Sequence, residues 1–397
     1  MRIGIDASCW LNRRGFGRYT RELVRALLAV DRENEYVLFL DDSTAALAPG
    51  LPSGDRASRV VVPTSAAAAL TASAHGSRSL GDLWRMRQAV GAWGNRLDLF
   101  YFPAVYTYFP VRTPARVVVT KHDMTDRRYP DLLFPNARSK LLWNVKVRLA
   151  MARADMVFTV SENSRRDILD VFPRPHDRVR VVADAVDPGF RPVPDGPERR
   201  GVLGRYGLDD RLRYLLYVGG ISPHKNLETL LIAFERLRGT NPQGSPTRLV
   251  LVGDFEADVF HSSYPMIRDR IERSGLRDAV LLTGYVPDSD LVHLYSAADA
   301  FVLPSFYEGF GLPALEAMSC GTPVVVSDVG ALPEVVGGAG LLFDPTSPEE
   351  LTDALQRLLS DDGLRSELRA KGLAQAARFR WEDSARAALA GFRETVR

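Results

Sequence analysis

The chain has 397 residues, of which 46% are hydrophobic and 25% charged, and its net charge is +2 at neutral pH. This length predicts two domains, or a single large one, and the composition excludes a disordered protein, a fibre and an integral membrane protein. A charge so close to zero gives no overall field that would favour a nucleic-acid partner. With only Cys9 and Cys320, and with no secretory signal expected before the first apolar segment, we expect a cytoplasmic protein.

Short β-branched or aromatic segments alternate with stretches of helical periodicity along the chain, which is typical of strand–helix–strand units and a parallel sheet. The expected strands of the first half are 2–7, 36–40, 59–62, 98–102, 116–120, 156–160 and 179–183. Between the third and fourth of them, the Ala-rich stretch 64–79 predicts a loop or an Ala-rich helix.

The pattern is interrupted at 191–201, which has the Pro, Gly and charge content of a linker, and then restarts. The expected strands of the second half are 214–218, 249–252, 280–282, 300–303, 323–327 and 340–343. We therefore predict an α/β protein with two doubly wound domains, 1–195 and 196–380, and a cleft between the carboxyl ends of their strands. A terminal helix over 381–397 can pack on either domain, including a return to the first.

The first strand leads to a turn that contains Gly15 and Gly17, and a helix is expected to begin near Arg18. This turn is not a GxGxxG motif, and no acidic residue ends the next strand in the dinucleotide manner, so we expect no nicotinamide cofactor. His122 and Asp123 follow the strand 116–120. A histidine at this edge of an α/β sheet is as compatible with catalysis as with packing.

Residues 136–154 combine basic and apolar side chains at helical spacing. The basic members are Arg138, Lys140, Lys146, Arg148 and Arg153, and the apolar members are Leu141, Leu142, Trp143, Val147 and Met151. Such a helix can contact an anionic membrane peripherally, on the inner face where lipid-linked acceptors lie. The favoured alternative is a domain helix with a solvated basic face.

In the second half, the strand 214–218 runs into Gly219 and Gly220, and a short loop then brings His224 and Lys225 to the start of a helix. A cation in the first helical turn opposes the helix dipole, so we favour contact between Lys225 and a phosphate over a solvated lysine. The DSD sequence at 288–290 matches a metal-binding DxD, but it precedes a helical segment. We interpret Asp288 or Ser289 as a helix cap and expect no metal.

The most informative segment is 304–328, where a buried strand ends, Glu308, Gly309 and Gly311 follow, and a helix begins near Leu312. Unpaired amides at such a helix start suit a phosphate. The carboxylates of Glu308 and Glu316, eight residues apart, suit the hydroxyl groups of a sugar and a ribose. Taken alone, the segment is equally compatible with an acidic residue that stabilises a helix dipole.

These segments, in this order, resemble the retaining glycosyltransferases of family 4, which have the GT-B fold. The resemblance covers nearly the whole chain: GRYTRELVRAL, the HD pair, VSENSRRDI, VGGISPHKN, LTGYVPDSDLVHLYSAADAFVLPS and EGFGLPALEAMSCGTPVV. The two glutamates separated by seven residues are its most specific element. The resemblance implies two Rossmann-like domains that face each other across a cleft, a nucleotide-diphosphate sugar as donor, and no metal cofactor.

The resemblance also implies roles for individual residues. Lys225 and the amides around 310–312 would bind the diphosphate, Glu316 the ribose, and Glu308 the donor sugar, while His122 would lie beside the reacting sugar. Tyr285 and Val286 would lie against the base. The residues implied to bind the donor are Gly15, Gly17, Gly219, Gly220, Lys225, Tyr285, Val286, Glu308, Gly309, Phe310, Gly311, Leu312 and Glu316, and those implied to act in catalysis are His122, Lys225 and Glu308.

One departure from the family pattern is Gly220, where many relatives carry an arginine, so the charge would fall to Lys225 or to a neighbour such as His224. The GGISPHKN form resembles bacterial mannosyl- and rhamnosyltransferases of surface polysaccharides, which favours GDP-mannose as donor. The acceptor would be a glycan, a lipid-linked sugar or a small molecule. Two alternatives remain: a nucleotide-sugar epimerase of the same fold, and a non-catalytic nucleotide-sugar-binding protein.

Overall fold

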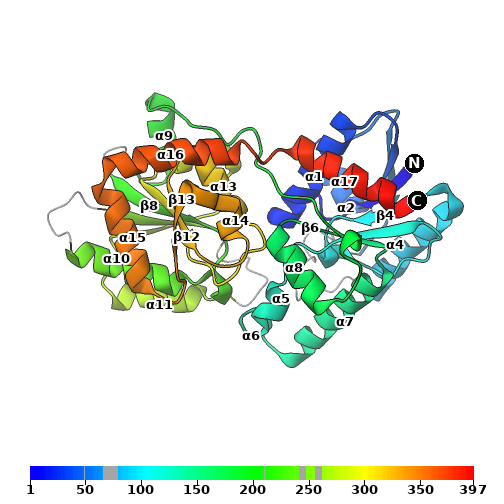
Figure 1. Ribbon diagram of the computed structural model, residues 1–397, viewed down its shortest axis with the longest axis horizontal. Helices are drawn as coiled ribbons and strands as arrows, with labels where there is room; N and C mark the ends of the chain where they lie inside the picture. The colour runs from blue at the N-terminus through cyan, green and yellow to red at the C-terminus, as the bar shows by residue number, and fades with distance from the viewer. Residues whose placement is uncertain (49, 66–78, 210–211, 241–246, 255–261) are drawn as a thin grey trace. The chain divides into compact units, whose positions relative to one another are not determined.

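The computed structural model describes residues 1–48, 50–65, 79–209, 212–240, 247–254 and 262–397. The chain forms two compact units, each with one parallel sheet between helices (Figure 1). The first unit comprises Met1–Pro130, Phe134–Asp184 and Arg380–Arg397, and the second comprises Asp131–Leu133 and Ala185–Phe379.

The sheet of the first unit has the strand order β3-β2-β1-β4-β5-β6-β7, with every neighbouring pair parallel. Its strands are β1 (Arg2–Asp6), β2 (Glu35–Asp41), β3 (Ala57–Val62), β4 (Leu99–Phe102), β5 (Arg116–Thr120), β6 (Met156–Thr159) and β7 (Val179–Val181). All seven predicted strands are confirmed. Central β4 is buried at each of its positions, as a strand covered by helices on both faces must be. The order reverses between β1 and β4, where doubly wound sheets bind ligands.

Helices cover both faces of this sheet. These helices are α1 (Gly15–Val30), α2 (Asp42–Leu47), α4 (Leu80–Trp93), α5 (Thr125–Arg128), α7 (Ala137–Arg153), α8 (Glu162–Val171) and α17 (Trp381–Val396). The short α6 (Pro130–Leu133) follows α5, and all of it but Pro130 belongs to the second unit. The terminal α17 belongs to the first unit and lies beside α1 (Figure 1). Trp381 packs edge-on against Tyr19 at 6.0 Å between ring centroids, and the Ser384 hydroxyl donates to the Ala183 carbonyl at 2.7 Å.

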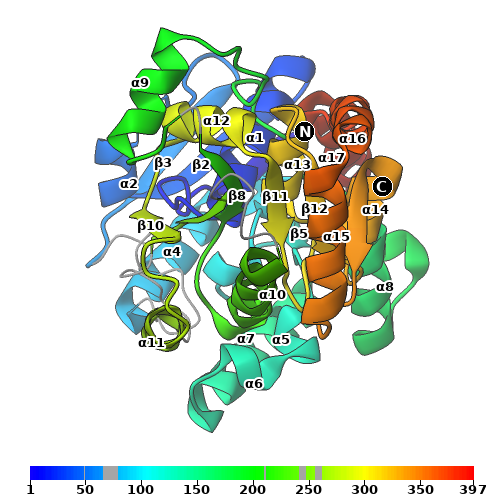
Figure 2. The ribbon, with the colours of Figure 1, turned by 90° about the vertical axis from the view of Figure 1, so that its left-hand side faces the viewer.

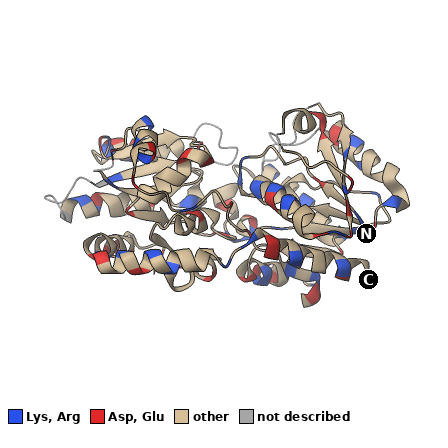
Figure 3. Ribbon diagram, turned by 90° about the horizontal axis from the view of Figure 1, so that it is seen from above, with Lys and Arg blue, Asp and Glu red and all other residues tan. Residues whose placement is uncertain are grey.

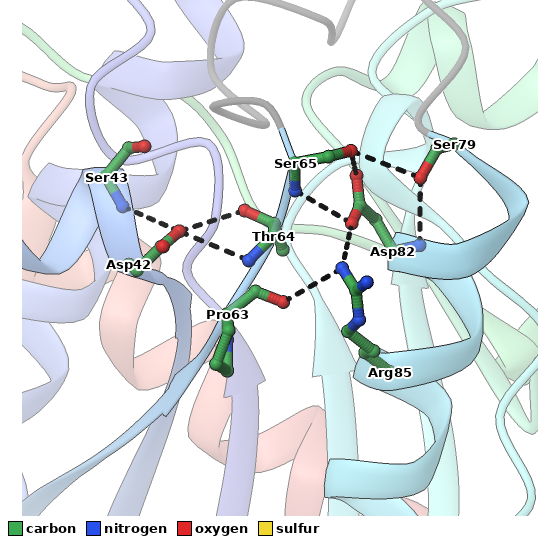
Figure 4. A network of polar contacts seen from close by, with 8 residues as sticks. All are labelled: Asp42, Ser43, Pro63, Thr64, Ser65, Ser79, Asp82 and Arg85. Carbon is green, nitrogen blue, oxygen red and sulfur yellow. Dashed lines mark hydrogen bonds and ion pairs between the residues drawn. The ribbon is translucent and has the colours of Figure 1, made fainter.

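A polar network ties the end of β3 to the start of α4 (Figure 4). The Asp82 carboxylate accepts from the amide and hydroxyl of Ser65 at 2.9 and 2.6 Å and from Arg85 at 2.8 Å, while Ser79 caps the Asp82 amide at 3.1 Å. Burial alone would raise the pKa of Asp82, but these donors outweigh it and lower the pKa. Residues 66–78, most of the Ala-rich stretch, lie outside the described residues.

The second unit repeats the same topology, with the strand order β10-β9-β8-β11-β12-β13. Its strands are β8 (Arg213–Val218), β9 (Thr247–Val252), β10 (Val280–Gly284), β11 (Ala300–Leu303), β12 (Val324–Ser327) and β13 (Gly340–Phe343). The six strands predicted for the second half are confirmed. Here the order reverses between β8 and β11, so the loops that leave these two strands lie next to each other.

The helices of the second unit alternate with its strands along the chain and follow the last strand. They are α9 (Pro197–Arg205), α10 (Leu227–Thr240), α11 (Tyr264–Arg273), α12 (Asp288–Ala297), α13 (Leu312–Ser319), α14 (Leu332–Val336), α15 (Pro348–Ser360) and α16 (Asp362–Ala376). Helices α10 and α15 pack together (Figure 2), as do α13 and α16. The expected linker 191–201 is shorter than predicted, because α9 already begins at Pro197, a residue well suited to a first helical position.

Basic and acidic residues are interspersed along the helices of each unit (Figure 3). This agrees with the balanced totals of 51 cations and 49 anions. None of the helices in the described part of the chain combines the length and the apolar character that crossing a membrane requires.

Candidate active site

The loop after β8 places Lys225 at the reversal point of the second sheet. Gly219 and Gly220 follow the strand directly, and the Gly220 carbonyl accepts from the Tyr217 hydroxyl at 2.7 Å. Asn226 ends the loop in a left-handed conformation, with φ of +54°. Its buried side chain donates to the carbonyls of Pro304 and Pro345 at 2.9 and 2.7 Å. Asn226 thus fixes the backbone next to Lys225, a role the sequence interpretation missed.

The loop after β11 brings Glu308 to the same place. The Lys225 ammonium lies 2.7 Å from Oε1 of Glu308, and the Ser305 hydroxyl donates to the same oxygen at 2.6 Å. The two loops are also joined by the Phe306 amide, which donates to the His224 carbonyl at 2.9 Å. The structure therefore brings together two of the predicted residues and adds Ser305, which was not foreseen.

Helix α13 begins where this loop ends, and its start offers unpaired donors. Gly311 has φ of +95°, and a Cβ atom there would lie 2.4 Å from Leu332, so only glycine fits. Within the described residues, the amides of Phe310, Gly311 and Leu312 donate no backbone hydrogen bond. The Phe310 ring packs against Phe379, so this residue presents its amide rather than its side chain. The arrangement suits a phosphate group.

Glu316 lies one turn into α13 and is buried, with 3% of its surface exposed. Its Oε2 accepts from the hydroxyl of Tyr295, a fully buried residue of α12, at 3.0 Å. Burying a carboxylate is unfavourable unless it is hydrogen-bonded, so Tyr295 stabilises Glu316 in place. Sequence spacing gave no sign of Tyr295, which is 21 positions away.

Tyr285 and Val286 follow β10, the edge strand of the sheet, which β9 separates from β8. Tyr285 is 48% exposed and Val286 is buried. Their loop thus leaves the same carboxyl edge as the loops of Lys225 and Glu308, but from a strand two positions away. A tyrosine ring at this position is of a kind that stacks on planar ligands.

The interpretation of Asp288 or Ser289 as a helix cap is wrong. Helix α12 begins at Asp288, and Pro287 precedes it without a side-chain cap, so these residues lie inside the first turn near the helix dipole. Asp290 is engaged by α9, with its two oxygens 2.7 Å from Arg205 and 2.8 Å from the Tyr206 hydroxyl. Among the described residues, no group of three His, Cys, Asp or Glu side chains is arranged to hold a metal ion.

His224 does not supply the charge that is lost with glycine at position 220. Burial, followed by the neighbouring Lys225 ammonium, lowers the pKa of His224 well below its usual value. The imidazole is therefore neutral at physiological pH, and Lys225 is the cation that this loop contributes.

In the first unit, Gly15 and Gly17 open α1 after the loop that leaves β1. A Cβ atom at Gly17 would lie 2.1 Å from the Asn12 carbonyl oxygen, whereas one at Gly15 would meet nothing within 4 Å. Arg21 holds the same loop by donating to the carbonyls of Trp10 and Asn12 at 2.6 and 2.8 Å. A side chain at position 17 would therefore clash with the Asn12 carbonyl, whereas one at position 15 would not.

His122 follows β5, with its ring edge-on to Tyr19 at 4.9 Å between centroids. Both ring nitrogens are buried and have no hydrogen-bond partner within the described residues. Burial lowers the pKa of His122 to about 4; the Asp123 carboxylate opposes this shift, and the Lys121 ammonium adds to it. A neutral imidazole with both nitrogens unused is suited to a hydrogen bond with a ligand hydroxyl.

The comparisons with known proteins agree with this picture. Residues 203–375 match the family described as glycosyl transferases group 1, and residues 13–190 match glycosyltransferase family 4. The O-antigen chain mannosyltransferase B of Escherichia coli is 35% identical over 375 residues, which is 93% of this chain and 93% of that protein. Sucrose-phosphate synthase from Thermosynechococcus elongatus superposes with a TM-score of 0.75 at 21% identity, covering 99% of this chain and 98% of its own. HepE from Anabaena, solved with UDP and glucose, superposes with a TM-score of 0.73 at 19% identity, covering 99% of each chain.

Proposed function

The chain belongs to the group 1 glycosyltransferases of family 4, with the GT-B fold, and from that membership we propose that it transfers a hexosyl group with retention of configuration. The donor is a nucleotide-diphosphate sugar, with GDP-mannose as the leading candidate, and the acceptor is a hydroxyl of a glycan. The choice of mannose is supported by the Escherichia coli relative, which is named as an O-antigen chain mannosyltransferase.

One observation carries the proposal: a lysine, a carboxylate and a row of unpaired amides meet at the reversal point of the second sheet. Lys225 and the amides of 310–312 bind the donor diphosphate from two sides. Glu308, already paired with Lys225, accepts from hydroxyls of the donor sugar, and Glu316 accepts from the ribose. The exposed Tyr285 ring lies against the base.

The chemistry follows from what these groups stabilise. The bond between the anomeric carbon and the diphosphate oxygen breaks, its electron pair stays with the phosphate, and Lys225 and the α13 amides stabilise the developing charge. The acceptor oxygen bonds to the same face of the oxocarbenium-like carbon, and its proton passes to the departing phosphate. His122, whose pKa burial lowers to about 4, is neutral at physiological pH and is proposed to hydrogen-bond a sugar hydroxyl.

In this proposal the diphosphate needs no metal ion. Support comes from Asp290, whose two oxygens already bond Arg205 and Tyr206, and from the fixed donors around the phosphate position. Gly219 and Gly220 belong to the loop after β8 and Gly309 to the loop after β11, both in the second unit, whereas Gly15 and Gly17 open α1 of the first unit.

We further propose a cytoplasmic protein that contacts the membrane peripherally through α7. Of the apolar residues that the sequence interpretation named in this helix, Trp143, Val147 and Met151 pack inward. Leu141 and Leu142 point outward, 62% and 60% exposed, beside Val145 and Leu149. The exposed stripe is therefore both apolar and basic, since Arg138 and Arg148 are exposed with it, and such a stripe favours an anionic bilayer surface.

The proposal is tested by measuring the binding of GDP, UDP, ADP and dTDP, each with its sugars, by calorimetry and thermal shift. A ligand at a hundredfold excess over its Kd stabilises the folded protein by about 2.7 kcal/mol, so a true donor stands out. We expect GDP-mannose to bind in EDTA and to lose affinity in Lys225→Met. Binding that requires magnesium overturns the metal-free assignment, and the absence of any nucleotide binding overturns the donor site itself.

A further inference from the structure

A buried ion pair lies beside His122 in the first unit. Lys121 directly follows β5, and its Nζ atom is 2.6 Å from Oδ1 of Asp126, with both side chains 4% exposed. The other carboxylate oxygen accepts from Nε1 of Trp143, on α7, at 2.9 Å. The Lys121 ammonium also lies 5.9 Å from the centroid of the Trp143 ring. Each oxygen of Asp126 therefore has a short-range donor.

Stability alone does not explain this pair. Removing two charges from water is unfavourable, and apolar side chains of similar volume in the place of a buried ion pair are often neutral or stabilising. A buried pair can instead fix the local conformation, because each partner allows the other only a narrow range of positions.

The pair closes a short loop, and His122 lies inside that loop. Lys121 is anchored to the neighbouring strand, since its amide donates to the Phe158 carbonyl at 2.9 Å. Asp123 turns the chain by accepting from the Thr125 amide at 2.9 Å. No hydrogen bond within the described residues holds the imidazole of His122. Its orientation therefore depends on the edge-on contact with Tyr19 and on the backbone that Lys121 and Asp126 fix on either side.

We propose that Lys121 and Asp126, held by Trp143, are positioning residues that fix the orientation of the His122 imidazole for catalysis. The inference rests on the proposed function, because the aim of His122 matters only if the chain transfers a sugar. It adds three residues to the catalytic arrangement, none of which touches the substrate.

The test is a double replacement by apolar residues, Lys121→Met with Asp126→Leu. If the pair positions His122, the double variant keeps its thermal unfolding midpoint and its Kd for the nucleotide, but its kcat falls by roughly 10- to 100-fold because the catalytic group is misplaced. Trp143→Phe, which keeps both charges and removes one hydrogen bond, lowers kcat by a smaller factor. Arg116→Met, which removes the pair with Asp155 at the opposite end of β5, leaves kcat unchanged.

A second readout does not depend on activity. In protein labelled at histidine, the ring resonances of His122 shift in the double variant and in Trp143→Phe, and stay in place in Arg116→Met. A double variant with wild-type kcat and an unmoved His122 signal overturns the proposal and leaves the pair a packing feature. If the wild-type protein transfers no sugar, the proposed function fails, while the resonance shifts still decide whether the pair orients His122.

Discussion

The Lys225 ammonium lies 2.7 Å from Oε1 of Glu308, which joins the loop after β8 to the loop after β11. In the proposed assignment, the cation for the donor diphosphate is thus paired, before any donor binds, with the carboxylate for the donor sugar. Each residue therefore influences what the other binds.

Glu308→Gln is expected to separate binding from turnover. Without the carboxylate, Lys225 is free to face the phosphates, so the bare nucleoside diphosphate binds at least as tightly as to wild type. The donor sugar loses its charged acceptor, and kcat falls by roughly 100-fold. Calorimetry with the diphosphate and a transfer assay measure the two effects.

Lys225→Met and Lys225→Arg are the matched controls. The methionine variant loses affinity for both the diphosphate and the sugar nucleotide, whereas the arginine variant keeps much of it. If Glu308→Gln weakens diphosphate binding as strongly as Lys225→Met does, the assignment of the two side chains is wrong.

Glu316→Gln is expected to weaken nucleotide binding through the ribose. The carboxylate accepts from the Tyr295 hydroxyl on one oxygen, and an amide in its place loses a charge-assisted acceptor that contributes roughly 1.5 to 3 kcal/mol. A 2′,3′-dideoxy nucleotide has no hydroxyl to offer, so its affinity is the same for wild type and variant. Competition binding with the two nucleotides makes the comparison, and an equal loss for both contradicts the ribose assignment.

Much of the fold follows from local sequence patterns. The strands of two parallel sheets appear as short apolar segments, because a strand covered on both faces, like β4, has no solvent side. The loops with Lys225 and Glu308 can be predicted from the sequence because each follows such an apolar strand. That they meet depends on the strand order, which places β8 next to β11.

The remainder of the site depends on contacts between distant residues. Asn226 bonds carbonyls 78 and 119 positions away, and no local pattern announces either bond. The sequence also does not predict which side of α7 is buried, because apolar residues lie all around that helix. Trp143 and Val147 are buried through their packing against the rest of the unit. Asp288 resembles a cap, yet Pro287 is the residue that precedes the helix.

Asn226 is expected to be the most sensitive structural residue of the donor loops. Asn226→Gly keeps the left-handed backbone but removes the side-chain donor of the Pro304 carbonyl and leaves the Pro345 carbonyl only the Thr229 hydroxyl, at 3.3 Å. This loss costs roughly 2 kcal/mol of unfolding free energy. Asn226→Leu also strains the backbone, where φ is +54°, and costs about 1 kcal/mol more. Chemical denaturation measures both, and equal stabilities for the two variants contradict the conformational part of the argument.

His122 is expected to make the protein less stable in acid. Its pKa is about 4 in the folded chain and about 6.5 when unfolded, so between these values the unfolded state binds more protons. The free energy of unfolding therefore falls as pH drops below 6.5, by roughly 3 kcal/mol once pH 4 is reached. Denaturant unfolding at pH 7 and pH 5 measures the slope.

His122→Gln has no such group to protonate, so its loss of stability over the same pH range is smaller. Part of the slope stays, because the lowered pKa of His224 acts in the same direction. Identical slopes for wild type and His122→Gln would contradict the burial argument for this histidine.

The exposed side of α7 is expected to bind anionic vesicles. Replacing Leu141 and Leu142 with serine removes apolar surface that would enter the bilayer, and each leucine contributes about tenfold in affinity. Sedimentation with phosphatidylglycerol and phosphatidylcholine vesicles measures the loss and the charge preference. Leu80→Ser is the matched control, since Leu80 is 85% exposed on α4. Equal losses for the control, or no binding by wild type, contradict the peripheral contact.

The central claim is that the chain transfers a hexose with retention from a nucleotide-diphosphate sugar to a glycan hydroxyl. The most direct test is to incubate the protein with GDP-mannose and a mannose-terminated oligosaccharide in EDTA, and to determine the anomeric configuration of the product by NMR. We predict a new glycosidic bond with the α configuration of the donor and the release of one GDP per bond. An inverted β product, or a converted nucleotide sugar without any acceptor, would contradict the account.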